Sequence, residues 1–150
     1  MDAIDRLILG LLQRDASMPV GDIAVAVGLS QTPCWRRIKR LEEDGVIAKR
    51  VALVDPAKAA FNLTAFVAVK TNQHTEKWLQ AFATEVSAIP EVLEIHRMTG
   101  DIDYLLKIVC RDMGHYDAVY KQLISSIEFS DVSSTFSMER IKETTELPLD

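Results

Sequence analysis

The chain has 150 residues, of which 48% are hydrophobic and 26% are charged. These values are typical of a soluble globular protein with one or two small domains. No apolar run approaches the roughly 18 to 20 residues of a membrane helix, and the acidic start, residues 1–6, does not resemble a secretory signal. The sequence therefore excludes a membrane protein and predicts a protein that stays in the cytoplasm.

The net charge of -5 is unevenly distributed along the chain. Residues 1–62 hold nine Lys and Arg against eight Asp and Glu, a balance of +1, whereas residues 63–150 hold eight against fourteen, a balance of -6. Most basic side chains of the first part gather between residues 36 and 50. Such segregation favours one module that faces an anion and a second module that does not.

The first predicted element is an amphipathic helix. Asp2 is a suitable capping residue, and the helix should end near Arg14. Its apolar positions follow helical spacing and comprise Ile4, Leu7, Ile8, Leu11 and Leu12. We expect this stripe to face the core of a small helical domain.

Two more helices follow closely. The second covers residues 20–27 and ends at Gly28, because glycine readily takes the left-handed conformation that ends helices. The third starts at once, is capped by Ser30 or Thr32, and runs to Gly45. A helix, a short turn and a second helix make a helix-turn-helix, which presents its second helix to the major groove of DNA.

After the third helix the pattern changes. Residues 46–54 are rich in β-branched side chains and predict a strand, and Asp55-Pro56 begins a linker. We place the domain boundary near residue 62. Residues 1–62 are therefore predicted to form a helix-turn-helix, winged-helix-like DNA-binding domain with a strand linker.

Strand-like and helix-like segments alternate in the remainder of the chain. In order, they are strand 63–71, helix 75–89, strand 92–99, strand 104–111, helix 113–127 and strand 132–138. Two successive βαβ units are typical of a ferredoxin-like sandwich, in which an antiparallel sheet carries both helices on one face. The predicted fold class is α+β, with a ferredoxin-like βαββαβ domain over residues 63–150.

The uncovered face of that sheet should alternate with polar residues if it met water, yet it is apolar. Phe66 and Ala68 on the first strand share this property with Leu105 and Val109 on the third. A second copy of the same face is the simplest cover, so we expect an obligate homodimer. The alternative is that short strands merely carry excess alanine and valine.

The third helix has the chemistry of a DNA-reading element. At about 100° per residue, its apolar side chains fall on the core side and its basic and hydrogen-bonding side chains on the exposed side. Arginine and lysine favour guanine edges, and neighbouring basic groups contact phosphates. The predicted DNA-binding residues are Gln31, Thr32, Trp35, Arg36, Lys39 and Arg40.

A solvated face is the alternative for this helix. Lys39 and Arg40 are then paired with Glu43 and Asp44 through helical i,i+3 and i,i+4 contacts. Trp35 also has two interpretations, because it can pack on the second helix or contact a sugar or a thymine methyl group.

Metal and catalytic sites are not predicted. Cys34 and Cys110 lie in a helix face and a strand, without a Cys-x-x-Cys pair, and are interpreted as reduced core thiols. His74, His96 and His115 are scattered, and no nucleophile-base spacing, Walker loop or dinucleotide fingerprint is nearby. We expect neither an enzyme nor a bound cofactor.

Three segments together resemble the Lrp/AsnC, or feast/famine, family of transcriptional regulators. They are residues 5–9 (DRLIL), 27–47 (VGLSQTPCWRRIKRLEEDGVI) and 99–104 (TGDIDY). The resemblance spans nearly the whole chain, and residues 32–35 (TPCW) are similar to a proteobacterial subgroup that includes cysteine-responsive regulators. It implies a RAM or ACT-like second domain that binds an amino acid, dimerises by packing sheets and assembles further into tetramers or octamers.

The same resemblance places the effector site, between dimers, at the turn before the third strand. The residues concerned are Met98, Thr99, Gly100, Asp101, Ile102 and Asp103. Physically, Gly100 allows close approach of a ligand, and Asp101 or Asp103 can accept hydrogen bonds from an α-ammonium group. A tight turn whose aspartates bond their own backbone is the alternative. Ile102 stands where the family commonly has an aromatic residue.

Ser133 and Thr135 of the last strand complete the list of effector candidates. Their hydroxyls either join a pocket from a neighbouring subunit or lie at a hydrated edge. The expected function is a regulator that binds double-stranded promoter DNA and whose DNA affinity or oligomeric state responds to an amino acid bound between subunits. The alternative is an architectural DNA-binding protein of the same fold that needs no effector.

Overall fold

The computed structural model describes residues 1–149 and divides into two units. One unit contains Met1–Leu53 together with the chain from Ile141 onward, and the other contains Val54–Arg140. This division lies earlier than the boundary we placed near residue 62, and the last residues join the helical unit rather than the sheet unit. The last residues join the helical unit because they contact its first helix, through Gln13 and Arg14.

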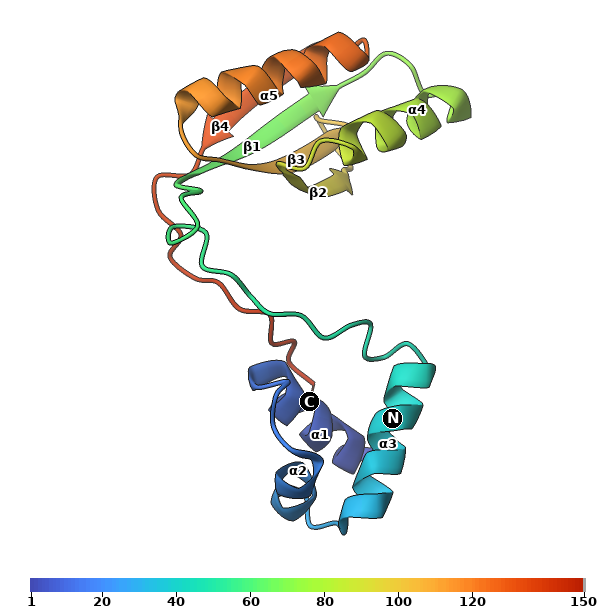
Figure 1. Cartoon of the computed structure of the whole chain (residues 1–150). Coiled ribbons are helices and arrows are strands. Elements are labelled where there is room, and N and C mark those ends of the chain that lie inside the picture. The colour runs from blue at the N-terminus through green and yellow to red at the C-terminus, as the bar shows by residue number, and fades with distance from the viewer. Residues whose placement is uncertain (150) are drawn as a thin grey trace. The chain divides into compact units, whose positions relative to one another are not determined.

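Three helices form the N-terminal unit (Figure 1), namely α1 (Ala3–Arg14), α2 (Val20–Ala26) and α3 (Gln31–Glu43). Asp2 caps α1 as predicted, because its side chain accepts a hydrogen bond from the Asp5 amide. The predicted apolar stripe was wrong at one position, since Leu7 is 58% exposed. The buried face of α1 is made instead by Asp5, Ile8, Leu9 and Leu12.

The turn between α2 and α3 follows the prediction. Gly28 has a φ of +70°, and the amides of Gly28 and Leu29 donate to the carbonyls of Val25 and Ala24, at 3.3 and 2.8 Å. This pairing is a Schellman motif, which satisfies the free carbonyls at the end of a helix. Ser30 precedes α3 as its N-cap residue, although its side chain makes no capping hydrogen bond.

The strand predicted over residues 46–54 is absent, and this prediction was wrong. The segment is irregular between residues 48 and 54, and within residues 1–149 it pairs with no other strand. A β-branched sequence forms a strand only when a neighbour supplies the hydrogen-bonding partners. Several of its apolar side chains are exposed, namely Val46, Val51, Leu53 and Val54.

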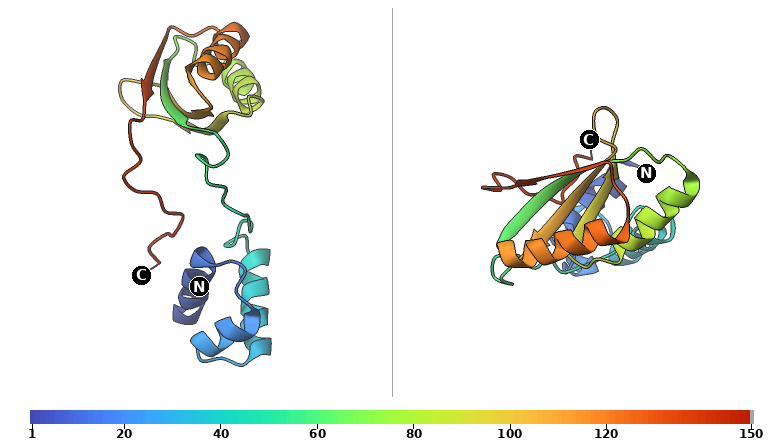
Figure 2. Two further views of the ribbon diagram at one scale, coloured as in Figure 1. Left: turned by 60° about the vertical axis from the view of Figure 1, so that its left-hand side comes forward. Right: turned by 90° about the horizontal axis from the view of Figure 1, so that it is seen from above.

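The C-terminal unit is the predicted ferredoxin-like sandwich. Its elements are β1 (Leu63–Lys70), α4 (Glu76–Ser87), β2 (Val92–Arg97), β3 (Tyr104–Cys110), α5 (Met113–Ser126) and β4 (Asp131–Phe136). The strand order is β2-β3-β1-β4, and every neighbouring pair is antiparallel. Figures 1 and 2 show α4 and α5 on one face of the sheet.

Alternation along β1 and β3 separates the two faces of the sheet. Ala65, Val67 and Val69 are buried beneath the helices, and all of the alternate β3 side chains from Tyr104 to Cys110 are also buried. The opposite side, which we call the open face, carries Phe66 at 37% exposure. Its other members on β1 and β3 are Thr64, Ala68, Lys70, Leu105, Lys107 and Val109, all of intermediate exposure.

The last residues return to the helical unit as an extended segment. Gln13 Nε2 donates to the Leu147 backbone carbonyl at 3.2 Å, and the Leu147 backbone amide donates to Gln13 Oε1 at 2.7 Å. Arg14 pairs with Glu146 at 3.5 Å, and Leu149 packs against the core of the helices. A cavity of about 620 Å³ lies between α1, residues 46–53 and this segment, and none of the predicted site residues lines it.

Candidate DNA-binding helix and effector loop

The core side and the exposed side of α3 divide as its spacing predicts. Cys34, Ile38 and Leu41 are buried in the helical core. All six candidate DNA-binding residues are exposed, namely Gln31, Thr32, Trp35, Arg36, Lys39 and Arg40. Trp35 is 48% exposed, so about half of its surface is open to a partner.

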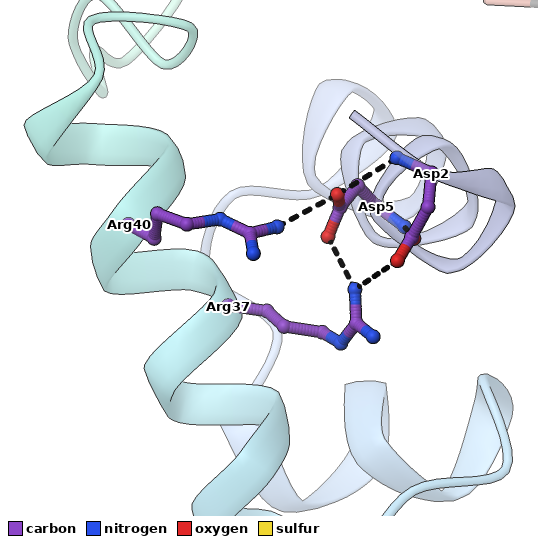
Figure 3. Close-up of polar contacts among 4 residues, drawn as sticks. All are labelled: Asp2, Asp5, Arg37 and Arg40. Atoms are coloured by element: carbon purple, nitrogen blue, oxygen red, sulfur yellow. Dashed lines mark hydrogen bonds and ion pairs between the residues drawn. The ribbon is translucent and has the colours of Figure 1, made fainter.

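Two of the basic side chains of α3 reach the start of α1, where they form an ion-pair cluster (Figure 3). Arg37 donates through Nη1 to Asp2 Oδ2 at 2.7 Å and to Asp5 Oδ1 at 2.8 Å. Arg40 donates through Nη2 to Asp5 Oδ2 at 2.7 Å. We call these four residues the Asp5 cluster: Asp2, Asp5, Arg37 and Arg40.

The Asp5 cluster also includes the cap of α1. The Asp2 amide donates to Asp5 Oδ2 and the Asp5 amide donates to Asp2 Oδ1, each at 2.9 Å, which is a capping box. The Asp5 side chain is 1% exposed and accepts three hydrogen bonds from Arg37, Arg40 and the Asp2 amide. A buried carboxylate is tolerated because it is both paired and hydrogen-bonded.

Ionisation of both carboxylates is favoured by these contacts. Burial opposes the charge on Asp5, but the Asp2 amide and the two guanidinium groups outweigh it and keep the pKa of Asp5 below its ordinary value. The hydrogen bond from Arg37 lowers the pKa of Asp2 from 3.8 to about 2. At neutral pH the cluster therefore carries two negative and two positive charges.

The ion pair of Arg40 differs from the one that the solvated-face alternative expected. Its guanidinium is not paired with Glu43 or Asp44, and it is already bound to Asp5 on one edge. Lys39 likewise pairs with Glu42, at 3.0 Å, and Glu42 also accepts from Arg50 at 3.0 Å. The candidate left without an ion pair within residues 1–149 is Arg36.

Neither Asp5 nor a partner for Arg37 was predicted from the sequence. The available signal was the Asp2-x-x-Asp5 spacing, which is the arrangement of a capping box. The two arginines lie 32 and 35 residues further along the chain, so their contact with Asp5 depends on how α3 packs on α1.

The loop between β2 and β3 is closed by its own backbone. The Met98 amide donates to the Asp103 carbonyl at 2.8 Å, and the Asp103 amide donates to the Val69 carbonyl of β1 at 3.0 Å. Gly100 has a φ of +106°, a conformation that favours glycine. Thr99, Gly100 and Asp101 are exposed at the tip of this loop.

Both loop carboxylates already have partners. Asp103 Oδ2 accepts from the Thr71 amide at 2.8 Å, which ties the loop to the end of β1. Asp101 is 99% exposed and pairs with Lys70 at 3.3 Å. The Asp103 carboxylate thus accepts from the backbone just after β1, whereas the tight-turn alternative expected a bond within its own loop.

The two β4 candidates lie on the open face at different distances from the loop. The register pairs Ser133 with Ala68 and Thr135 with Phe66, so Ser133 is nearer to the loop end of β1. Thr135 Oγ1 donates to the Phe66 carbonyl at 3.2 Å. Because β4 is an edge strand, Thr135 lies at the edge of the open face, farther from the loop than Ser133.

The remaining titratable groups show structural contacts. Cys34 and Cys110 are buried free thiols, as predicted, and burial raises the pKa of each. His96 pairs with Glu94 and His115 with Glu91, each at 2.9 Å. Within the part of the chain that the structure describes, no group of His, Cys, Asp and Glu has a metal-binding arrangement.

A three-helix unit with an exposed basic helix, joined to a ferredoxin-like unit with an exposed loop, defines a two-domain class of regulatory protein. The AsnC-type helix-turn-helix domain matches residues 1–42, and the Lrp/AsnC ligand binding domain matches residues 64–147. The chain therefore belongs to the Lrp/AsnC family of transcriptional regulators, as its sequence motifs suggested.

Several relatives match over nearly their whole length. The DNA-binding transcriptional activator DecR of Escherichia coli is 48% identical over 151 residues, covering 100% of this chain and 99% of DecR. The glutamate uptake regulatory protein of Zymomonas mobilis is 46% identical over 149 residues, covering 99% of this chain and 91% of that protein.

Two solved structures share the fold. An AsnC family transcriptional regulator from Agrobacterium tumefaciens superposes with a TM-score of 0.97 at 56% identity, covering 99% of this chain and 97% of its own. The transcriptional regulator NMB0573 of Neisseria meningitidis, solved with L-Met, has a TM-score of 0.94 at 34% identity, covering 100% of this chain and 97% of its own.

Over residues 1–149, no helix has the length and hydropathy to cross a membrane.

Proposed function

We propose that the protein regulates transcription by binding double-stranded promoter DNA through α3, and that an amino acid bound between subunits changes its DNA affinity or oligomeric state. The observation that carries the DNA-binding half is the exposed face of α3. It combines Arg36, which has no ion pair within residues 1–149, with Lys39 and with hydrogen-bonding groups at the start of the helix. Such a face can read base edges and contact phosphates.

The effector half is supported by the loop between β2 and β3 and by a related structure. The loop presents an exposed glycine with a positive φ, where a ligand can approach the backbone closely. NMB0573 was solved with L-Met, which is an amino acid ligand on the same fold. We infer that residues 98–103 contribute to an amino acid site, with Ser133 as a neighbouring group.

Assembly is the third part of the proposal. The open face has Phe66 at its centre, flanked by Leu105 and Val109, and a second copy of this face is a matching cover. A homodimer presents two α3 helices to two half-sites, and packing of dimers into tetramers or octamers multiplies them. An effector then acts by its different affinity for the alternative assemblies.

The test of the DNA-binding half is a double substitution, Arg36→Ala with Lys39→Ala. We expect loss of operator retention in gel-shift assays with the assembly unchanged by sedimentation. A matched control is Arg6→Ala with Lys58→Ala, which removes the same charge from exposed positions outside α3. If wild-type protein and the α3 variant retain DNA equally, α3 is not part of the DNA interface.

A second candidate function is an architectural DNA-binding protein that needs no effector. The observation that favours it is the loop itself, because Asp101 and Asp103 already bind Lys70 and the Thr71 amide. Thermal unfolding against a panel of saturating amino acids separates the two, since a ligand that binds only the folded state raises the transition. A shift that Gly100→Ala removes and Gly21→Ala preserves supports the effector site, whereas no shift with any amino acid supports the architectural function.

A further inference from the structure

Arg40 is held by one edge only. Its Nη2 donates to Asp5 Oδ2 at 2.7 Å, and this is the one hydrogen bond of its guanidinium among residues 1–149. The side chain is nevertheless 52% exposed. A guanidinium carries five N–H donors in a planar fork, so the edge opposite the carboxylate keeps donors that face solvent.

Arg37 differs from Arg40 in both exposure and partners. It is 26% exposed and bridges the two carboxylates of Asp2 and Asp5. Asp5 would therefore remain paired with Arg37 and the Asp2 amide even without Arg40. Arg37 has the arrangement of a structural partner, whereas Arg40 is attached to a carboxylate that the rest of the cluster holds in place.

The position of Arg40 on α3 favours a phosphate rather than a base as its external partner. It lies one turn after Arg36 and toward the C-terminal end of the helix. In helix-turn-helix proteins the N-terminal residues of the second helix contact base edges, and phosphate contacts lie around them. A planar fork that is fixed on one edge loses less freedom when its other edge binds a phosphate.

We propose that Asp5 is a positioning residue for DNA binding, which holds the Arg40 guanidinium by one edge so that the opposite edge donates to a backbone phosphate. This inference rests on the proposed function of α3. It assigns a role in DNA binding to a buried side chain of α1, from which no contact with DNA is expected.

The opposing interpretation is that Asp5 simply neutralises Arg40. The two interpretations differ in the sign of one effect. If Asp5 positions Arg40, then Asp5→Asn weakens DNA binding. If Asp5 neutralises Arg40, then removal of the carboxylate frees a positive charge, and Asp5→Asn tightens DNA binding.

The experiment measures the dissociation constant for operator DNA against salt concentration for wild type, Asp5→Asn and Arg40→Lys. Lysine keeps the charge of Arg40 but cannot bind a carboxylate and a phosphate with two edges of a fork. We expect both variants to lose one phosphate contact, which lowers affinity roughly tenfold at 0.1 M salt and reduces the slope of log K against log salt by about 0.9. The double variant should lose no more than Arg40→Lys alone, because both changes remove the same contact.

The matched control is Asp22→Asn, which makes the same change of charge at an exposed position of α2 outside the cluster. It should leave the salt slope unchanged. Loss of stability alone also leaves the slope unchanged when binding is measured on fully folded protein. Since Arg40→Lys leaves Asp5 with two partners, it tests the inference even if Asp5→Asn fails to fold.

Tighter binding by Asp5→Asn, or wild-type slopes for both Asp5→Asn and Arg40→Lys, would overturn the inference. The Arg36→Ala with Lys39→Ala variant separates this failure from failure of the proposed function. If that variant loses binding while the slopes of the other two are unchanged, α3 contacts DNA without help from Asp5. If that variant binds as wild type does, the assignment of α3 to DNA is itself wrong.

Discussion

The Asp5 carboxylate links α1 to α3 through hydrogen bonds and ion pairs. Its two carboxylate oxygens accept hydrogen bonds from the side chains of Arg37 and Arg40 and from the Asp2 amide. A buried ion pair contributes little net stability, but breaking it by removal of one partner costs about 3–5 kcal/mol, because the other charge is left uncompensated. The cluster therefore specifies how α3 sits on α1 more than it stabilises the unit.

The Asp5 cluster gives the N-terminal unit an acid-sensitive stability. The pKa of Asp2 is lowered to about 2 in the folded protein, from an ordinary value of 3.8. A group whose pKa is lower in the folded state stabilises the protein above its ordinary pKa, and this contribution is lost as the pH falls toward the folded value. We expect stability to fall between about pH 5 and pH 2.

Asp2→Asn tests this expectation, because asparagine still caps a helix but cannot form an ion pair with Arg37. The variant should be less stable than wild type at neutral pH, and the difference should shrink as the pH approaches 2. Urea midpoints measured at a series of pH values check it, with Asp22→Asn as the control. A difference that stays constant with pH contradicts the assigned role of the Asp2 charge.

At the scale of the helices, the sequence predicted the bounds of α1, α2 and α3 closely but rotated the buried face of α1. Both the predicted set and the observed set follow helical spacing, so spacing alone could not choose between them. From sequence alone a carboxylate is expected on the surface, because charged side chains are almost never fully buried without a partner. The partners of Asp5 are on another helix, and the prediction therefore placed Leu7 in the core instead.

The turn after α2 makes a prediction about backbone conformation. Alanine at position 28 has to take a φ near +70°, which costs about 1–2 kcal/mol although the space around its Cβ is open. Gly10→Ala is the matched control within α1, where a Cβ makes only an ordinary contact with Arg14 at 3.7 Å. That change should stabilise the helix by up to about 1 kcal/mol.

Urea unfolding of Gly28→Ala and Gly10→Ala therefore has to give shifts of opposite sign. Shifts of the same sign would mean that the left-handed turn at Gly28 is not a requirement of the helix-turn-helix.

The missing strand over residues 46–54 shows a limit of pattern-based prediction. The pattern of β-branched residues predicted a strand, but a strand requires a second segment to pair with. The same limit did not affect β1 to β4, because each of them has a neighbour within the same unit. The apolar side chains of this segment remain exposed as a result.

At the scale of the whole molecule, the ferredoxin-like fold and the alternation of its strands were predictable, since every strand and helix lies close to its expected bounds. The candidate site was less predictable. The exposure of α3 follows from periodicity, whereas the partners of Arg40, Asp101 and Asp103 depend on contacts between distant segments. Sequence therefore identifies these residues more readily than it assigns their roles.

The open face makes a prediction about assembly. Phe66 is 37% exposed and lies opposite Lys107 on β3 and Thr135 on β4. Lys107 is already paired with Glu94 at 2.7 Å, so Phe66→Glu adds a second carboxylate to the proposed dimer contact, where burial of a charge without a partner of its own is costly. We expect sedimentation equilibrium to show a shift from the wild-type assembly to a monomer.

Ile124→Glu serves as the control for this change, because Ile124 is 44% exposed on α5, which covers the other side of the sheet. This control variant should retain the wild-type mass. If Phe66→Glu also retains the wild-type mass, the open face is not the dimer contact.

The return of the last residues to α1 means that the sheet unit is, in topological terms, an insertion within the helical unit. Residues 1–53 and 141–149 both belong to the helical unit, and the insertion starts at Val54 and ends at Arg140. Excision of residues 54–140, with a short glycine-serine bridge in their place, would leave all three helices and the contact between Gln13 and Leu147. Such a minimal protein would keep the helix proposed to bind DNA and would lack the loop proposed to bind a ligand.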